Sequence, residues 1–332
     1  MVDFAVASVN EAEPPRHRLV RYVVGYDSSG SMRGTCPVRL VKEIGMTIAS
    51  YPVTDPVAEH GEGPVWSGRW GGLRWVDMLA GDVLMLDLDG NVRRRHVAKV
   101  AAVVRPRVSG GYVVAAEREL LLADSDDLDA PLRSLGEAWT DPAIRMNEGG
   151  CDPDGRFYIG TMAYDESPGR GSFYVAEPDG TLRMVLPEVT ISNGFDFSPD
   201  GSLAYYTDTA TGRVDVFDYD PEGGLSGRRP FVFIDREVGA PDGLTVDDEG
   251  GVWVALWQGA AVHRYDVGGR LDAIVGLPVR KVTSVAFGGE NLDRLFITTS
   301  ARDVDRAEQP EAGSLFAADP GVPGRPVLPT TL

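Results

Sequence analysis

Cysteine and histidine are scarce in this chain, which removes the commoner disulfide and metal frameworks from consideration. The 332 residues include two cysteines, Cys36 and Cys151, and four histidines. Two cysteines do not make a disulfide framework, and the sequence has no CxxC, HxH or HExxH spacing. A reducing compartment is the simplest interpretation of this cysteine content. We therefore predict a cytoplasmic protein.

Basic charge and long apolar runs are also lacking. Lysine and arginine total 32 against 50 aspartates and glutamates, which gives a formal net charge of −18. Nucleic acids and anionic membranes attract clusters of basic residues, so the sequence predicts neither as a partner. No stretch approaches the roughly 18 apolar residues of a membrane helix. The N-terminus has acidic residues in place of the apolar core of a secretory signal.

The sequence does contain an internal repeat. A Gly-containing turn, a β-branched and aromatic strand, a short link and an alternating strand recur along the chain. The clearest strand of each copy begins 39 to 49 residues after the one before it. These strands lie at residues 73–78, 112–117, 156–162, 203–209, 252–257 and 294–300. Short strands separated by turn residues, with no long window of helical period, indicate an all-β protein.

Six copies of about 45 residues are typical of a radial array. We predict a six-bladed β-propeller with four-stranded blades over residues 51–332. The alternative, a β-sandwich, does not need six copies of one unit. Residues 1–50 lie outside the period and are expected to be a poorly ordered extension. We expect a monomer or a weak homodimer.

The extension contains one motif with a chemical meaning. The apolar strand ending in D-x-S-x-S resembles the metal-ion-dependent adhesion motif of von Willebrand A domains, with Asp27, Ser29 and Ser31 as its ligands. Such a domain needs well over 100 further residues, whereas the repeats begin about 30 residues later. A second hypothesis is that translation starts at Met46, and the intact mass of natively expressed protein would test it.

The repeat also predicts which side chains meet at the axis of the propeller. The first strand of each blade lines the central channel, so residues at one phase of these strands converge at one mouth. Counting eight residues back from the turn glycine of the third, fourth and fifth copies gives Asn147, Asn193 and Asp242, and Glu62 holds the equivalent position in the first copy. The other two copies place small residues there.

Two carboxylates and amide oxygens completed by water suit a hard divalent cation. The alternative is that Asp and Asn before Gly are common turn formers, and P-D-G occurs four times. Only Pro241-Asp242-Gly243 precedes a first strand, whose own turn comes later. We therefore predict Asp242 as a site residue and interpret the other three copies as outward turns.

Two further segments lie near the predicted mouth. Arg145 precedes Asn147 by two residues, so both can face the channel from one side of an extended strand. It could bind hydroxyl or carboxylate groups of a ligand, or form an ion pair with Asp242 or Glu148. The polar loop 162–171 leaves the third copy on the same side, and Asp165 on it is either a substrate contact or a solvated loop residue.

These motifs together resemble the senescence marker protein (regucalcin), gluconolactonase and luciferin-regenerating enzyme family. The resemblance extends from about residue 58 to residue 318. It is carried by ordered motifs that include GEGPVW (61–66), RMNEGGCDPDGRFYIGTM (145–162), ISNGFDFSPDG (191–201) and PDGLTVDDEGGVWVA (241–255). The family is a six-bladed propeller with one divalent metal ion in its channel, and most members hydrolyse lactones of sugar acids.

The resemblance implies a role for each matching residue. Its metal ligands would be Glu62, Asn193 and Asp242, and its substrate contacts would be Arg145 and Asn147. Asp165 stands where animal members place a glutamate, which leaves the choice of substrate open. The ion would be Ca²⁺, Zn²⁺, Mn²⁺ or Mg²⁺, since all four accept oxygen ligands and water.

The resemblance therefore predicts a metal-dependent lactonase that converts a sugar lactone to its aldonic acid. Its metal ion would polarise the lactone carbonyl, Asp242 would accept a proton from the attacking water, and Arg145, Asn147 and Asp165 would orient the sugar. The alternatives are a non-catalytic metal-binding or scaffold propeller, and a hydrolase of another ester such as an organophosphate. A strictosidine-synthase-like condensation would use the fold without this metal set.

Overall fold

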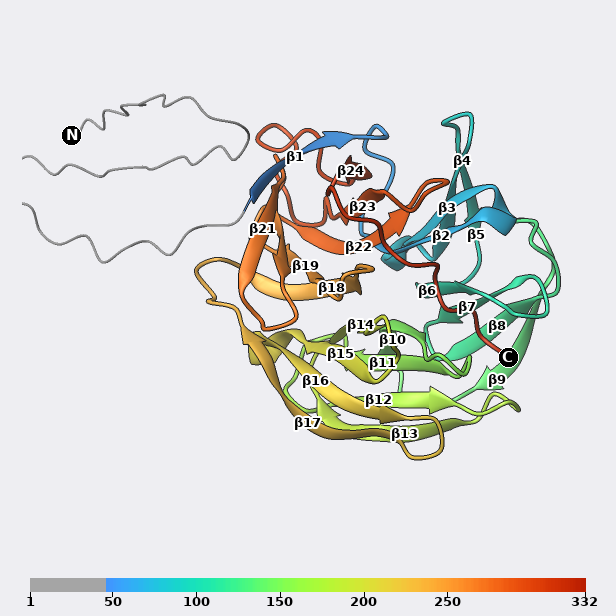
Figure 1. Ribbon diagram of the computed structural model, residues 1–332. Coiled ribbons are helices and arrows are strands. Elements are labelled where there is room, and N and C mark those ends of the chain that lie inside the picture. The colour runs from blue at the N-terminus through green and yellow to red at the C-terminus, as the bar shows by residue number, and fades with distance from the viewer. Residues whose placement is uncertain (1–45) are drawn as a thin grey trace, which may run out of the picture. The chain divides into compact units, whose positions relative to one another are not determined.

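The computed structural model describes residues 46–332, and almost all regular structure in that range is β-strand. Figure 1 shows the strands of this part arranged as a propeller-like ring of twisted sheets. The exceptions in residues 46–332 are three 3-10 turns, η1 (Gly68–Trp70), η2 (Met78–Ala80) and η3 (Thr209–Thr211). No helix in that range is long and apolar enough to span a membrane. The adhesion-like motif at residues 27–31 lies outside the described residues.

Sixteen of the strands described in residues 46–332 form four separate antiparallel sheets of four, each in chain order. The first sheet is β2 (Gly61–Ser67), β3 (Gly72–Asp77), β4 (Asp82–Asp87) and β5 (Val92–His96); the second is β6 (Ala101–Pro106), β7 (Tyr112–Ala116), β8 (Glu119–Ala123) and β9 (Leu132–Glu137). The third is β10 (Ile144–Cys151), β11 (Phe157–Ala163), β12 (Gly171–Ala176) and β13 (Leu182–Val189); the fourth is β14 (Ser192–Phe197), β15 (Leu203–Asp208), β16 (Arg213–Asp220) and β17 (Gly224–Phe233).

The remaining eight strands form one continuous sheet. In spatial order these are β18 (Ala240–Val246), β19 (Val252–Trp257), β20 (Ala261–Tyr265), β21 (Leu271–Gly276), β1 (Met46–Pro52), β24 (Phe316–Ala318), β23 (Arg294–Thr299) and β22 (Val282–Gly288). The prediction of four-stranded blades in an all-β ring is confirmed. The prediction of six separate blades is wrong, because residues 46–332 show four such blades and one eight-stranded sheet.

Strand β1 is the reason for the difference. It pairs in parallel with β21, where Met46 is opposite Ala273, and antiparallel with β24, where Ser50 is opposite Ala318. One strand from the beginning of the ring thus joins two groups from its end into one sheet. The predicted boundary at residue 50 falls inside β1, so the propeller-like unit includes residues 46–50.

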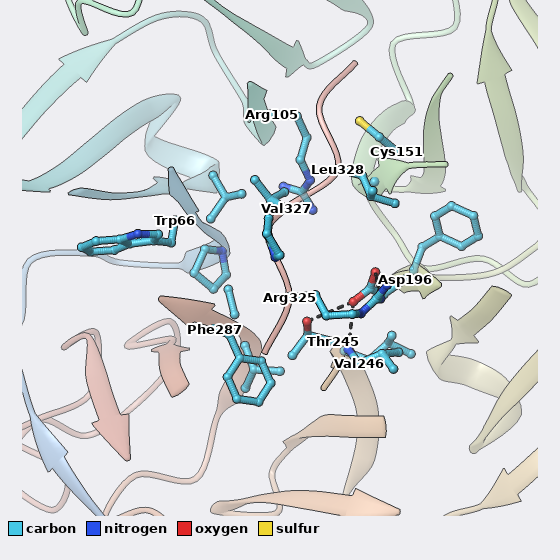
Figure 2. Close-up of a pocket in the computed structure, with 18 residues that line it drawn as sticks. Trp66, Arg105, Cys151, Asp196, Thr245, Val246, Phe287, Arg325, Val327 and Leu328 are labelled. Carbon is cyan, nitrogen blue, oxygen red and sulfur yellow. Dashed lines mark hydrogen bonds and ion pairs between the residues drawn. The ribbon is translucent and has the colours of Figure 1, made fainter. Parts of the chain in front are cut away.

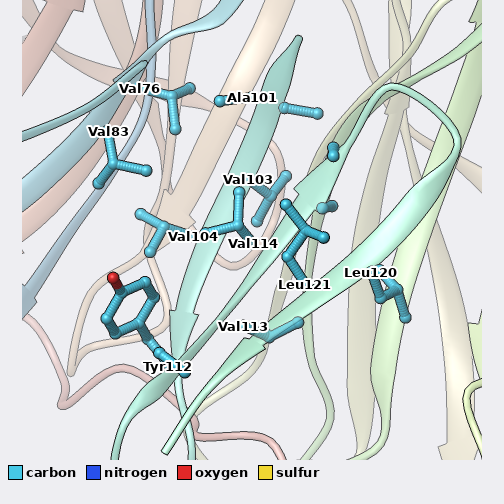
Figure 3. Packing of buried hydrophobic residues seen from close by; sticks show 14 of the residues in the cluster. Val76, Val83, Ala101, Val103, Val104, Tyr112, Val113, Val114, Leu120 and Leu121 are labelled. Carbon is cyan, nitrogen blue, oxygen red and sulfur yellow. The ribbon is translucent and has the colours of Figure 1, made fainter. Parts of the chain in front are cut away.

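The first strands of the repeats are the innermost ones. Within residues 46–332, strands β2, β6, β10, β14, β18 and β22 contact one another in a closed circle. Apolar side chains fill the space between neighbouring sheets. Figure 3 shows one such region, where Val76 and Val83 of the first sheet meet Val104 and Val114 of the second, all four fully buried. Full burial stabilises the fold by about 1.5–3 kcal/mol for each valine-sized or larger side chain.

Candidate active site at one mouth of the channel

Each of the six innermost strands in residues 46–332 is interrupted at the same phase. The pairing register with the second strand shifts after Glu62, Ala101, Met146, Ser192, Pro241 and Val282. A β-bulge leaves one or two residues unpaired and re-aims their side chains. Asn147, Asn193 and Asp242 are among the unpaired residues, and Glu62 is the last paired residue before its bulge. The bulges therefore free Asn147, Asn193 and Asp242 from the ladder at the same end of the innermost strands where Glu62 lies.

Two glycines show how closely these strands approach one another. A Cβ atom on Gly194 would lie 2.4 Å from the backbone nitrogen of Leu244, and one on Gly243 would lie 2.2 Å from the Ser284 hydroxyl. Only glycine fits such an approach without moving the neighbouring strand. The glycines that follow Asn193 and Asp242 are thus required by the close packing of the innermost strands. They are not there only because Asn-Gly and Asp-Gly are common in turns.

Three carboxyl groups are buried together at this mouth. Glu62, Glu148 and Asp242 are 3%, 3% and 5% exposed. Burial raises the pKa of Glu62 most, followed by the charges of Asp242 and Glu148. Burial and the charge of Glu148 likewise raise the pKa of Asp242. Within residues 46–332, the Asp242 Oδ1 atom is buried with no hydrogen-bond partner.

Glu148 is a buried carboxylate of this mouth that the repeat phase does not predict, because it stands next to the counted position. From the sequence, Glu148 is expected only as an ion-pair partner for Arg145. Its carboxylate lies 3.7 Å from the Arg105 guanidinium and accepts a hydrogen bond of 3.5 Å from the Ser284 hydroxyl. The two-residue bulge between Met146 and Gly149 was the available signal, because it frees Asn147 and Glu148 together.

A chain of hydrogen bonds fixes the two amide side chains. Arg145 donates to Asn147 Oδ1 at 2.6 Å, and Asn147 Nδ2 donates to Asn193 Oδ1 at 3.1 Å. Asn193 Nδ2 donates to the Thr209 hydroxyl at 2.7 Å, and that hydroxyl donates to the Pro241 carbonyl at 2.7 Å. Because the Thr209 proton is committed to Pro241, the Asn193 amide can have only one orientation here. Thr209 is a second residue at this mouth for which the sequence carries no signal.

The donor set fits a hard divalent cation. An unpartnered buried carboxylate oxygen on Asp242 is costly unless a cation or proton compensates it. Glu62 and Glu148 supply further carboxylate oxygens, and Asn193 supplies an amide oxygen, which are ligands such ions prefer. In the part of the chain described, no three His, Cys, Asp or Glu side chains form a metal-binding group by themselves. A cation here would therefore depend on the amide oxygen and on water as well.

The predicted substrate contacts differ in their surroundings. Arg145 is buried, its Nε atom has no partner within residues 46–332, and burial lowers its pKa to about 10. Asp165 is exposed, and its carboxylate accepts a hydrogen bond from the Ser167 backbone N–H at 3.1 Å. Among the described residues, no hydrogen bond or ion pair joins Asp165 to Arg145 or Asn147.

Tyr164 is the residue of this loop that contacts the site. Its ring centroid lies 5.7 Å from the Arg145 guanidinium carbon, and its hydroxyl donates to Glu117. The Lys99 ammonium lies 5.1 Å from the same ring and 2.5 Å from Glu117. Tyr164 is 39% exposed, so one part of the ring remains open to solvent beside Arg145.

The opposite end of the channel is closed by the C-terminal segment. A cavity of about 70 Å³ is lined by the later residues of the innermost strands and by residues 325–328. Figure 2 shows several of these residues around it. Arg325 lies 3.7 Å from Asp196 and donates to the Ser198 and Phe197 carbonyls. Cys151 also lines this cavity, and burial raises the pKa of its thiol to about 12. The cavity is therefore separate from the carboxylate-rich mouth, which precedes it along every strand.

A ring of four-stranded sheets whose innermost strands bring buried carboxylates to one mouth defines a β-propeller with a polar channel. The chain belongs to the SMP-30/gluconolactonase/LRE-like family, whose model matches residues 60–301. Regucalcin of Danio rerio is 36% identical over 267 residues, which cover 78% of this chain and 90% of regucalcin. A Bacillus subtilis protein provisionally named sugar lactone lactonase YvrE is 32% identical over 274 residues, 80% of this chain and 92% of its own length.

A solved structure gives the same result. The calcium-binding protein regucalcin of Agrobacterium tumefaciens superimposes with a TM-score of 0.81 at 27% identity, over 87% of this chain and 99% of that protein. The predicted family is thus confirmed.

Proposed function

We propose that the protein hydrolyses lactones of sugar acids to the corresponding acids, with one divalent metal ion held by Glu62, Asn193 and Asp242. The observation that carries the proposal is the buried, unpartnered Asp242 oxygen beside two other buried carboxyl groups. The lactonase name of the Bacillus relative and the gluconolactonase in the family description support the same reaction class. The calcium-binding description of the Agrobacterium relative makes Ca²⁺ the first ion to test, ahead of Zn²⁺, Mn²⁺ and Mg²⁺.

In this mechanism the chain's own residues bind, orient and move a proton. Asp242 accepts the proton of the attacking water at its carboxylate. Arg145 donates hydrogen bonds to substrate hydroxyls. Asn147, whose amide is fixed by Arg145, Ser192 and Asn193, is the second predicted substrate contact. Thr209 positions the Asn193 amide. A bound divalent cation would supply the Lewis acid that polarises the lactone carbonyl. Asp165 stays a predicted substrate contact, and Tyr164 joins it on structural grounds.

The test is proton release from a panel of aldonolactones near pH 7, using chelator-treated protein with each divalent ion added back. We expect turnover that depends on metal and falls at least 100-fold in Glu62→Gln and in Asp242→Asn. The exposed turn variant Glu290→Gln serves as the control and should match the wild type.

Two outcomes would replace the proposal with one of its alternatives. Tight metal binding without turnover of any lactone would indicate a non-catalytic metal-binding propeller. Metal-dependent turnover of simple carboxylic or phosphate esters but not of lactones would indicate a hydrolase of another ester.

We also infer that the eight-stranded sheet acts as two of six blades. Its two halves, β18 to β21 and β22 to β24 with β1, each have four strands and one innermost strand. This interpretation accounts for the bulges at the same phase of β18 and β22.

A further inference from the structure

Three cationic side chains gather around His60 at one side of the mouth. The chain carries −18, yet Arg145, Lys281 and Arg302 all lie close enough to His60 to act on it. This side of the mouth therefore places several cationic side chains near the proposed metal ligand Glu62.

A continuous set of contacts leads from the proposed metal ligand Glu62 to Lys281. The His60 Nε2 atom lies 3.9 Å from Glu62 Oε1. The His60 and Trp257 rings meet edge to face with centroids 5.9 Å apart. The Lys281 ammonium lies 4.9 Å from the Trp257 ring centroid. The lysine thus lies two side chains away from the proposed reaction centre.

The strand register places these residues at the same end of the channel as Asp242. Trp257 pairs with Ala240 at the start of β18, two residues before Asp242. Ser300 bridges to His60, and the Ser300 backbone N–H donates to the Lys281 carbonyl at 3.0 Å. Lys281 directly precedes β22, just as His60 directly precedes β2.

Lys281 is a buried cation that forms no ion pair in the described part of the chain, where Asp303 is the carboxylate near enough for its charge to act on it. The residue is 7% exposed, and its ammonium donates to the Arg302 backbone carbonyl. No carboxylate within residues 46–332 lies at ion-pair distance from it. By contrast, the buried Arg264 guanidinium is matched by Asp247, Glu249 and Asp272. A buried charge is costly when it is unpaired, so an unmatched ammonium beside a site indicates an anionic ligand.

We propose that Lys281, held over the Trp257 ring, and Arg302 form a subsite for an anionic group, a phosphate or a carboxylate, carried by the lactone substrate away from its ring carbonyl. The Arg302 side chain is 46% exposed and lies 3.5 Å from the exposed Asp303, so it can turn toward a ligand. The inference rests on the proposed function, because it assigns the substrate class of the same site.

The experiment compares three lactones of one sugar acid with metal-loaded protein. The first is neutral, the second is phosphorylated on the terminal hydroxyl, and the third has a carboxylate at that carbon. We expect kcat/KM to be at least 10-fold higher for one or both anionic lactones than for the neutral one. The anionic lactone with the higher kcat/KM shows whether the subsite recognises phosphate or carboxylate.

The ratio of anionic to neutral kcat/KM distinguishes recognition from a structural role. Lys281→Met should bring this ratio close to one, and Lys281→Arg should retain most of it. Arg229→Gln removes one positive charge from the outer strand β17 and should leave the ratio unchanged. A lysine with only a structural role would lower both activities in proportion. An unchanged ratio in Lys281→Met, or equal activities in the wild type, would overturn the subsite.

A binding measurement separates this inference from the lactonase proposal. Calorimetry with the three hydrolysed acids reports the terminal anion without turnover. Tighter binding of the two acids with a terminal anion that is lost in Lys281→Met would support the subsite even if no lactone reacts. Turnover of lactones together with equal affinities for the three acids would overturn the subsite alone.

Discussion

Glu62, Glu148 and Asp242 are each buried beside other carboxyl groups. A bound cation would compensate their negative charges, whereas without a cation these charges destabilise the folded protein. Their raised pKa values have burial as the first cause and neighbouring carboxylates as the next for Glu62 and Asp242. An acid whose pKa is higher in the folded state destabilises that state as pH rises above the unfolded value. Below the ordinary carboxyl pKa near 4.5, both states hold the proton and nothing is lost.

We predict that Glu62→Gln stabilises the chelator-treated protein at pH 8 and has little effect at pH 4. Removing one uncompensated buried charge should be worth roughly 1–3 kcal/mol, or a Tm increase of several degrees. Thermal melts across this pH range would show it, with Glu290→Gln as the control. A lower Tm for Glu62→Gln at pH 8 without metal would contradict the electrostatic account.

Tyr164 is expected to bind substrate through its ring. The ring lies beside Arg145 and is held by Glu117, so its open part can pack against the sugar. Tyr164→Ala should raise KM about 10-fold with a smaller change in kcat, whereas Tyr164→Phe, which keeps the ring, should stay within about threefold. Steady-state kinetics on the best lactone would measure both. Equal losses in the two variants would assign the effect to the hydroxyl and Glu117.

Counting from turn glycines predicts Asn147, Asn193 and Asp242 at one end of the innermost strands, and a longer first turn brings Glu62 to the same end. The count follows the structure because the bulges occur at one phase of the repeat. The roles of these residues stay predictions. The count could not predict the position of Tyr164, because that position depends on how the loop folds over Arg145. Thr209 and Lys281 likewise depend on contacts between neighbouring repeats rather than within one.

At the scale of elements, the C-terminal segment, residues 325–332, forms hydrogen bonds with several sheets. Thr330 exchanges backbone hydrogen bonds with Pro106 and Val108, and the Thr331 N–H donates to the Gly155 carbonyl, each at 2.8 Å. Arg325 binds carbonyls at the end of the fourth sheet. The segment therefore connects the second, third and fourth sheets across the far end of the channel.

We predict that a chain ending at Gly324 is much less stable but still folds. It loses at least five hydrogen bonds worth about 0.5–1.5 kcal/mol each, and it exposes the apolar side chains of Val327 and Leu328. The Tm should fall by about 10 °C or more. Differential scanning calorimetry would measure the fall against Arg229→Gln as the control. A Tm within two degrees of that of the full chain would show that residues 325–332 contribute little to the stability of the ring.

At the scale of the whole molecule, a divalent cation should raise stability because the ligands come from different parts of the ring. Glu62, Asn193 and Asp242 belong to three sheets. A cation at 100 times its Kd would add about 2.7 kcal/mol, which is a Tm increase of several degrees. Melting with chelator and with Ca²⁺ tests this, and Asp242→Asn should abolish the increase. Identical curves for the wild type in both conditions would argue against a metal site.

The repeat period also determined how much of the ring could be predicted. The strand expected at residues 112–117 is β7, Tyr112–Ala116, and the others agree similarly, because alternation and turn residues are local signals. β1 could not be predicted. Its sequence lies outside the period, and its partners β21 and β24 are more than 200 residues away. The eight-stranded sheet is a consequence of that long-range pairing.

The pairing of β1 with β24 also constrains how the protein is made. Ser50 leaves the ribosome long before Ala318, its partner, has been translated. The far end of the channel needs Thr330 and Thr331, almost the last residues of the chain. Domains generally begin to fold from the N-terminus during synthesis. In this ring, however, the pairing of β1 with β24 cannot form until Ala318 has been translated. An exposed β1 edge during that interval is a site where chaperones or aggregation compete with closure.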